Sequence, residues 1–415
     1  MVLVPQTDLY SFFSEERFSC LDYLDDSELD PASRAHISEQ VCDLLGLFFQ
    51  VTKCTYLPFE KDTHLRQQLW GWAEKELTHA TSYDMGSLQP VLEAAASFTE
   101  SCYPLASNEM RLSMSQGTAF IVSLDSYLIH PTVKQNLAQS QCRLSAGLKP
   151  LDDFSSSYSA FTKEVADLYG SLDPLIGTLS ASGWGQHVEG WCLEEQIQLA
   201  YSHTQCEAES ESQSQSQSQS ESTSKSRPAP QSQSQSMKIC HVEDFPFYLR
   251  SITGVPIPYI TGIFKPTRGL EVPYTLWMSC LPALKVFACL SNDLFSYPKE
   301  LLDCEKFNFI NIQTKTKQDA GFKSQFVEDR PWTVRDTLYE TANRAVQCVR
   351  AIDEAFGARR PAGSSSGARS VDYEFQLAAT LWSLFKQGYI SWHIRCPRYR
   401  LDTLRSRFEG SLQVN

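Results

Sequence analysis

The sequence predicts an all-α protein, a single helical bundle formed by all 415 residues. Apolar residues recur at helical spacing along nearly the whole chain, and no segment has the convincing period-two alternation of a strand. Hydrophobic residues make up 42% of the chain and aromatic residues 12%, which is enough for a large buried core.

The expected helices follow one another along the chain. Residues 33–52, which begin just after Pro31, and residues 62–78 each place apolar side chains on one stripe. Residues 108–129 are apolar around most of the helix toward their C-terminal half, which is typical of a helix in the centre of a bundle. The remaining expected helices are 149–170, 186–203, 274–303, 331–356 and 371–396.

Two segments depart from this regular pattern. The short apolar segment 257–260 contains Pro258 and follows Pro256, and these two prolines favour a broken helix. Residues 207–236 are a Ser-Gln repeat with almost nothing that could be buried. We expect 207–236 to be a disordered loop inserted within the single domain, since chain entropy tolerates such insertions.

The overall composition restricts partners and location. A net charge of −13 argues against a nucleic-acid partner, because binding phosphates over an extended surface needs a basic face. Thirteen cysteines without a paired Cys-x-x-Cys pattern indicate free thiols in a reducing compartment. No signal peptide and no run of twenty apolar residues is apparent, so a cytoplasmic protein without a membrane span is expected.

The segment 292–300, Asn-Asp-Leu-Phe-Ser-Tyr-Pro-Lys-Glu, is the most informative part of the chain. Asn292, Ser296 and Glu300 stand four residues apart, and steps of four stay on one face of a helix. An amide oxygen, a hydroxyl and a carboxylate on that face form a hard-oxygen site suited to Mg²⁺, which completes its shell with water and phosphate. The spacing therefore predicts a site for a metal that carries a diphosphate.

Basic residues that could bind the phosphate oxygens occur in three places. They are Arg250 in Phe-Tyr-Leu-Arg, Lys299 within the metal segment, and Arg398, which precedes Tyr399 in Cys-Pro-Arg-Tyr-Arg-Leu. An arginine fork binds phosphate oxygens in pairs, and a lysine supplies a point charge.

Together these segments resemble the class I terpene cyclases, most closely the fungal branch related to trichodiene synthase. Residues 292–300 match the second metal motif of that family, Asn-Asp-x-x-Ser-x-x-Lys-Glu, and Arg398-Tyr399 matches its C-terminal Arg-Tyr pair. Residues 189–196 look like its Glu-Gly-x-Trp-x-Glu-Gln segment, and 244–250 look like the segment with its pyrophosphate-sensing arginine. Order and spacing agree from about residue 110 to 402, so the resemblance implies the α-helical bundle of class I terpenoid synthases.

Two features depart from the family pattern. Its first metal motif is rich in aspartates, but the corresponding segment here retains only Asp125. Because clustered carboxylates supply much of the affinity for divalent ions, we expect weak metal binding until a diphosphate completes the site. Pro298 removes a helical hydrogen bond to Leu294, and we expect a kink between two of the ligands.

The resemblance implies a sesquiterpene cyclase that acts on farnesyl diphosphate with Mg²⁺, and α-humulene is the leading product expected. The implied metal ligands are Asn292, Ser296, Glu300 and Asp125. The groups expected to bind diphosphate are Arg250, Lys299, Arg398 and Tyr399. The candidate lining of the hydrocarbon pocket is Phe120, Trp277, Tyr389 and Trp392, whose ring faces would stabilise a carbocation. A homodimer is left open.

Three alternatives remain at this point. A chain-elongating prenyltransferase would need two aspartate-rich motifs, and neither is complete here. A cyclase-like protein that binds an isoprenoid without catalysis would explain the missing aspartates. A helical interaction protein with a Ser-Gln-rich tether would explain residues 207–236 but not the phosphate-binding set.

Overall fold

The structure, a computed structural model, describes residues 9–25, 29–58, 60–126, 129–217, 242–254, 256–357 and 368–412. Across these ranges the regular structure is helical, and extended pairing is limited to one isolated bridge between Lys323 and Pro331. The predicted all-α fold is confirmed.

Several helices of the N-terminal half have first turns that are capped by side chains. Asp30, Asp62, Asp84, Ser107 and Asp152 each accept a hydrogen bond from a backbone N–H of the helix that follows. The elements are α1 (Leu9–Phe13), α2 (Pro31–Val51), α3 (Thr63–Trp72), a π-helical turn (Ala73–Leu77), α4 (Thr78–Thr81), α5 (Met85–Cys102), α6 (Asn108–Asp125), α7 (Pro131–Ser145), α8 (Asp153–Gly170) and α9 (Pro174–Gln217).

Three helices of the C-terminal half are longer than twenty residues. Its elements are α10 (Phe245–Thr253), α11 (Pro256–Phe264), α12 (Tyr274–Trp277), α13 (Leu281–Leu302), α14 (Phe309–Asp319), α15 (Val334–Gly357), α16 (Ala368–Arg395) and α17 (Asp402–Leu412). Short 3₁₀ turns cover Glu16–Leu21, Met278–Cys280 and Pro397–Tyr399.

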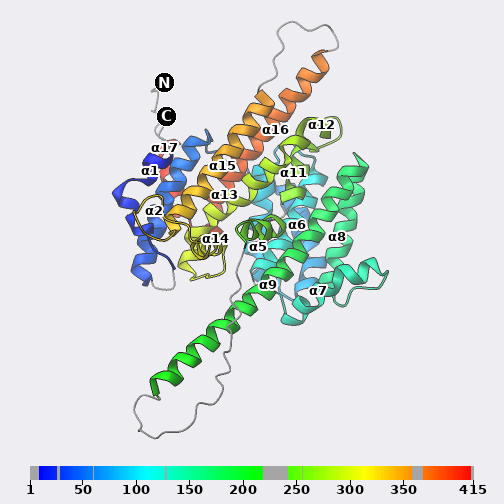
Figure 1. Ribbon diagram of the computed structural model, residues 1–415. Helices are drawn as coiled ribbons and strands as arrows, with labels where there is room; N and C mark the ends of the chain where they lie inside the picture. The colour runs from blue at the N-terminus through cyan, green and yellow to red at the C-terminus, as the bar shows by residue number, and fades with distance from the viewer. Residues whose placement is uncertain are drawn as a thin grey trace.

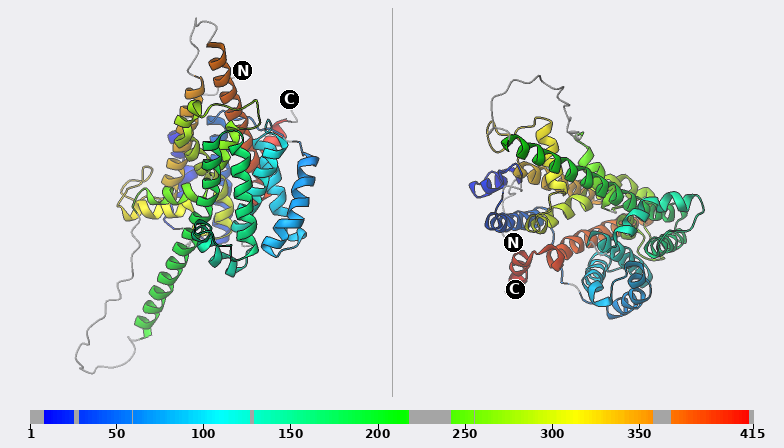
Figure 2. Two further views of the ribbon diagram at one scale, coloured as in Figure 1. Left: turned by 90° about the vertical axis from the view of Figure 1, so that its right-hand side faces the viewer. Right: turned by 90° about the horizontal axis from the view of Figure 1, so that it is seen from below.

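Helix α13 occupies the centre of this bundle. It packs against α2, α11, α15 and α16, and Figure 1 shows α15 beside it; Figure 2 gives two further views of the helices. Phe287 and Phe295 on α13 are fully buried, and burying such a side chain contributes about 1.5–3 kcal/mol. Among the described residues, only the stretch Tyr274–Leu302 is long and apolar enough to cross a membrane, and here it packs within the bundle.

Close approach between helices is built into the sequence at Gly388 on α16. A Cβ atom there would lie 2.0 Å from the backbone oxygen of Ser101 at the end of α5. Only glycine allows α16 to pack this closely on α5, and this contact positions the C-terminal part of α16 that carries Tyr389, Trp392 and His393.

The structure also departs from the predicted elements. The prediction missed α5, although the Asp84 cap and the helical spacing of Leu88, Val91 and Leu92 are the usual signals for such a helix. It placed the end of α6 at residue 129 rather than Asp125. Helix α13 begins at Leu281 rather than at residue 274, and it continues through Pro298 to Leu302, as the expected helix does. The kink expected at Pro298 stays a prediction.

The Ser-Gln-rich segment is partly described. Helix α9 runs to Gln217 and extends out of the bundle, so residues 207–217 are helical rather than a disordered loop (Figure 1). Glutamine and glutamate are good helix formers, and a helix begun in the bundle can therefore continue through them. The remainder of the predicted loop, 218–236, lies outside the described residues.

Candidate active site

One cavity of about 670 Å³ lies among α5, α6, α9, α10, α11, α13 and α16. This volume is within the range of small-molecule sites. The eight residues predicted to bind metal or diphosphate all line it: Asp125, Arg250, Asn292, Ser296, Lys299, Glu300, Arg398 and Tyr399.

The three oxygen ligands predicted on α13 face this cavity together. Asn292, Ser296 and Glu300 lie on successive turns, as their four-residue spacing requires. Next to them, Oδ2 of Asp293 is buried and has no hydrogen-bond partner. Hard oxygen atoms on one face, with an unpartnered carboxylate oxygen alongside, form a donor set that fits Mg²⁺.

Asn292 is held in one orientation by three neighbours. Its Nδ2 donates to Nε2 of His393 and to the hydroxyl of Tyr399, both at 3.1 Å. Its Oδ1 accepts from Nη2 of Arg250 at 2.6 Å. The same guanidinium donates from Nε to Oδ1 of Asp293 at 2.5 Å, so Arg250 binds two adjacent residues of the predicted metal segment.

His393 fixes the direction of the Asn292 amide through its tautomer. Nδ1 of His393 lies 2.8 Å from the carbonyl oxygen of Tyr389, which can only accept, so Nδ1 carries the proton. Burial lowers the pKa of His393 to about 3, so the ring is neutral and Nε2 accepts from Asn292. Sequence reasoning gave His393 no role.

Several carboxyl groups in the cavity have raised pKa values. Burial raises the pKa of Glu194 to about 7 and that of Asp293 to about 6. Burial also raises the pKa of Glu300 and of Glu305, and Glu305 adds repulsion at Glu300. The protein places too little positive charge near these carboxylates to balance their negative charge, and a bound cation would balance it.

Asp125 lies across the cavity, at the end of α6. Its Oδ2 is 3.5 Å from Nη2 of Arg398, whose Nη1 donates to Oγ of Ser126 at 3.0 Å. Lys299 lies 3.8 Å from a carboxylate oxygen of Glu305. Within the described ranges, no group of three or more His, Cys, Asp or Glu side chains could hold a metal ion. A metal here therefore depends on the Asn and Ser oxygens as well as the carboxylates.

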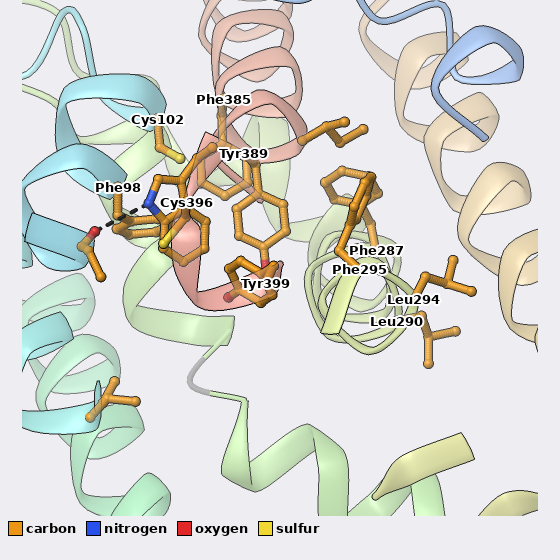
Figure 3. Close-up of a cluster of buried hydrophobic side chains, with 14 of the residues drawn as sticks. Phe98, Cys102, Phe287, Leu290, Leu294, Phe295, Phe385, Tyr389, Cys396 and Tyr399 are labelled. Carbon is orange, nitrogen blue, oxygen red and sulfur yellow. Dashed lines mark hydrogen bonds between the residues drawn. The ribbon is translucent and has the colours of Figure 1, made fainter. Parts of the chain in front are cut away.

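Aromatic side chains form the apolar part of the cavity wall. Phe98 lies 4.7 Å from Tyr259 and 5.0 Å from Trp392 between ring centroids. Trp392 contacts Tyr399, whose hydroxyl binds Asn292, so the aromatic wall adjoins the polar groups directly. Figure 3 shows Phe98, Tyr389 and Tyr399 close together.

Hydrogen bonds hold two of these rings in place. The Tyr389 hydroxyl donates to the carbonyl of Ala288 at 2.8 Å, and Nε1 of Trp392 donates to the carbonyl of Ala94 at 3.2 Å. Both rings line the cavity, as predicted. Because their polar atoms are bonded to other helices, the rings present fixed faces to its interior.

The prediction is wrong for the other two pocket residues. Phe120 is fully buried against Trp72 and Phe154 and is not among the residues that line the cavity. Its neighbours Ile121 and Val122 line the cavity instead. Trp277 is fully buried and stacks on Phe264, with ring centroids 4.9 Å apart. Both residues belong to the packed core, because a helix that is apolar on all sides does not reveal which side meets a cavity.

Further lining residues were not assigned roles from the sequence. Asp293 adjoins a predicted ligand, and Glu194 lies in a segment used for the family resemblance. The sequence around both residues could therefore have indicated that they belong to the site. Phe98 was missed along with α5. Nothing local in the sequence marks His187, Tyr259 or Glu305 as cavity residues.

Comparisons with known proteins agree with this architecture. No family model matches the sequence. The chain is 25% identical to alpha-cuprenene synthase COP6 of Coprinopsis cinerea over 170 residues, which are 41% of this chain and 42% of that protein. It is also 25% identical to terpene synthase 29 of Postia placenta over 169 residues, 40% of each chain. The chain thus spans about two fifths of the length of these relatives.

A solved structure supports the fold assignment. Linalool/nerolidol synthase from Streptomyces clavuligerus, solved in complex with 2-fluorogeranyl diphosphate, covers 81% of this chain and 100% of its own, with a TM-score of 0.50 and 12% identity. The helical bundle of this protein is therefore the class I terpene synthase fold. In sequence, the chain is a relative of fungal terpene synthases over the matched segments.

Proposed function

We propose that this chain is a class I terpene synthase of the trichodiene-synthase-like branch that converts farnesyl diphosphate, with Mg²⁺, into a cyclic sesquiterpene hydrocarbon. The observation that carries the proposal is the shared cavity, in which three oxygen donors, three cationic side chains and an aromatic wall meet. The names of the fungal relatives, alpha-cuprenene synthase and terpene synthase 29, support the same class of reaction.

The polar side of the cavity would bind the diphosphate. Asn292, Ser296, Glu300 and Asp125 would hold Mg²⁺, which when bound neutralises the leaving diphosphate. Arg250, Lys299 and Arg398 would bind its remaining oxygens, and the hydroxyl of Tyr399 would donate to another. Fixed donors aimed at the developing charge of the leaving group favour breaking of the allylic C–O bond.

The aromatic side would fold the prenyl chain and shield its cation. Ring faces of Phe98, Tyr389 and Trp392 attract a positive charge by about 0.5–2 kcal/mol each and do not react with it. The hydrogen bonds of Tyr389 and Trp392 to other helices limit their rearrangement as the charge moves. The substrate to test first has fifteen carbons, and the product to look for first is α-humulene.

The decisive experiment incubates the purified protein with farnesyl diphosphate, with and without Mg²⁺, and analyses the volatile extract by gas chromatography and mass spectrometry. A metal-dependent fifteen-carbon hydrocarbon is expected. No product from farnesyl, geranyl or geranylgeranyl diphosphate would contradict the proposal.

A second candidate, a catalytically silent isoprenoid-binding protein, is favoured by one observation. Asp125 is the single carboxylate left from the first metal motif, and it is paired with Arg398. Calorimetric binding of farnesyl diphosphate without release of diphosphate would select this candidate.

The third candidate, a helical interaction protein, depends on residues 207–236. Among the α9 residues whose side chains the structure describes, the last that lines the cavity is Gln198, well before residue 207. Full turnover by a variant that lacks residues 207–236 would dismiss a role for this segment in the reaction.

The homodimer and the cytoplasmic location remain proposals. The cytoplasmic location is supported by the free thiols of the eleven cysteines whose side chains are described.

A further inference from the structure

His187 is a buried polar residue in the cavity wall that the binding of metal and diphosphate does not use. It lies on α9 with 1% of its surface exposed, and it lines the cavity beside Thr253 and Gly254. Its position is far in sequence from the predicted metal segments.

The hydrogen bonding of His187 determines its tautomer. Nδ1 lies 2.7 Å from the carbonyl oxygen of Thr253, and because this oxygen can only accept, Nδ1 carries the proton. Burial lowers the pKa of the ring, which is therefore neutral. Nε2 keeps its lone pair, is buried, and has no hydrogen-bond partner. A buried acceptor without a partner destabilises the fold and needs an explanation.

Two glycines hold His187 against the end of α10. Gly183 and Gly190 lie four residues before and three residues after it, on the same face of α9. A Cβ atom at Gly183 would lie 2.6 Å from Cδ of Pro258, and one at Gly190 would lie 2.8 Å from Cγ1 of Ile252. The missing side chains let α10 and α11 approach α9, which brings the Thr253 carbonyl to the imidazole.

The charges around His187 suit transient protonation. Asp125 across the cavity favours a positive charge on the ring, whereas Arg250 opposes it. His187 lines the same cavity as these two residues and as the aromatic rings of Tyr389 and Trp392. A neutral imidazole with an available lone pair is a suitable proton acceptor.

We propose that Nε2 of His187 is the base that ends the carbocation reaction. A C–H bond next to the cationic carbon breaks, its electron pair forms the new C=C bond, and the proton binds the lone pair of Nε2. The resulting imidazolium is neutral again once it transfers this proton to the released diphosphate. This inference rests on the proposed terpene synthase function, and it names a protein group in place of diphosphate as the first proton acceptor.

The test compares His187→Asn with the wild type. An asparagine Nδ2 can keep the bond to Thr253, while Nε2 is lost. We expect the rate of diphosphate release to stay within about tenfold of the wild-type rate, which corresponds to about 1.4 kcal/mol in the activation barrier. Ionisation of the substrate does not need the base. The wild-type hydrocarbon should make up a share of the products that is at least about tenfold smaller, and alcohols or isomeric alkenes should replace it. A fall of this size is what the loss of a modest general-base contribution would cause.

Val188→Ala is the matched control, since Val188 is the buried neighbour of His187 but does not line the cavity. Its product ratios should equal those of the wild type. If the wild type is active and His187→Asn gives the same product ratios, the assignment of His187 as the base is overturned but the proposed function is not. A wild type that makes no product would instead overturn the proposed function.

A measurement on the wild type guards against variants that fail to fold. Nitrogen NMR of histidine-labelled protein distinguishes protonated from unprotonated ring nitrogens, with His187→Gln used to assign the signal. An unprotonated Nε2 in the resting protein is expected. A proton on Nε2 would overturn the inference, because the nitrogen could not then accept another.

Discussion

Nη2 of Arg250 donates a hydrogen bond to Oδ1 of Asn292 at 2.6 Å, which links α10 to α13 at the predicted metal site. The atom that would bind a metal is thus bonded to a cation. The amide cannot turn away without losing its bonds to His393 and Tyr399. A diphosphate, however, offers Arg250 new partners.

Metal binding should therefore depend on diphosphate. We expect Mg²⁺ to bind at least about tenfold more tightly when inorganic diphosphate is present, about 1.4 kcal/mol of coupling. Isothermal titration of Mg²⁺ with and without diphosphate measures this difference. Equal affinities in both titrations would show that the Arg250–Asn292 contact does not restrain the metal site.

Arg250→Lys should slow diphosphate release by more than about tenfold, or about 1.4 kcal/mol. One ammonium group cannot reproduce the two bonds that the guanidinium makes to Asn292 and Asp293. The control is Arg17→Lys, which changes a surface ion pair to Asp43 where Arg17 is 42% exposed. That variant should keep wild-type turnover, and equal rates in both variants would remove Arg250 from the mechanism.

Glu300→Ala and Asn292→Ala should each abolish turnover, because each removes a predicted metal ligand. The fold should remain, although Asn292→Ala also loses hydrogen bonds worth about 0.5–1.5 kcal/mol each. Circular dichroism and diphosphate release measure the two effects separately. Glu354→Ala, an exposed change on α15, is the control for turnover. Wild-type activity in either ligand variant would contradict the metal assignment.

Asp125→Asn tests whether one carboxylate serves in place of an aspartate-rich motif. We expect more than a tenfold loss of turnover, at least about 1.4 kcal/mol. Stability should change little, because the pair with Arg398 is 41% exposed at the aspartate and such pairs contribute about 0–1 kcal/mol. Steady-state rates at increasing Mg²⁺ measure the effect. A smaller loss at saturating Mg²⁺ would mean that other groups replace the first motif.

Gly388→Ala should destabilise the protein by about 1–3 kcal/mol, as overpacking does. The new Cβ would lie 2.0 Å from the backbone oxygen of Ser101, and a backbone atom cannot turn aside. Gly71→Ala on α3 is the matched control, since no atom lies within 4 Å of its added Cβ. That change should be neutral or stabilise by up to about 1 kcal/mol. Chemical denaturation compares the two, and equal midpoints would contradict the close packing of α16 on α5.

Much of the polar site could be predicted from the chain because its residues are close together in sequence. Asn292, Ser296 and Glu300 share one helix, and a four-residue step fixes a shared face whatever the helix packs against. Arg250 and Arg398 were found through short segments that resemble a family, and both line the same cavity. Their contacts with Asn292 and Asp125 could not be read from those segments.

The sequence by itself determined that the chain is helical and that three oxygen ligands lie on one face, because both follow from spacing within a helix. Only the tertiary structure decided which apolar face meets the cavity. It placed Phe120 in the core and Ile121 in the wall. It also left Nε2 of His187 without a partner. Such properties depend on contacts between helices far apart in the chain, which the spacing of residues along one helix does not specify.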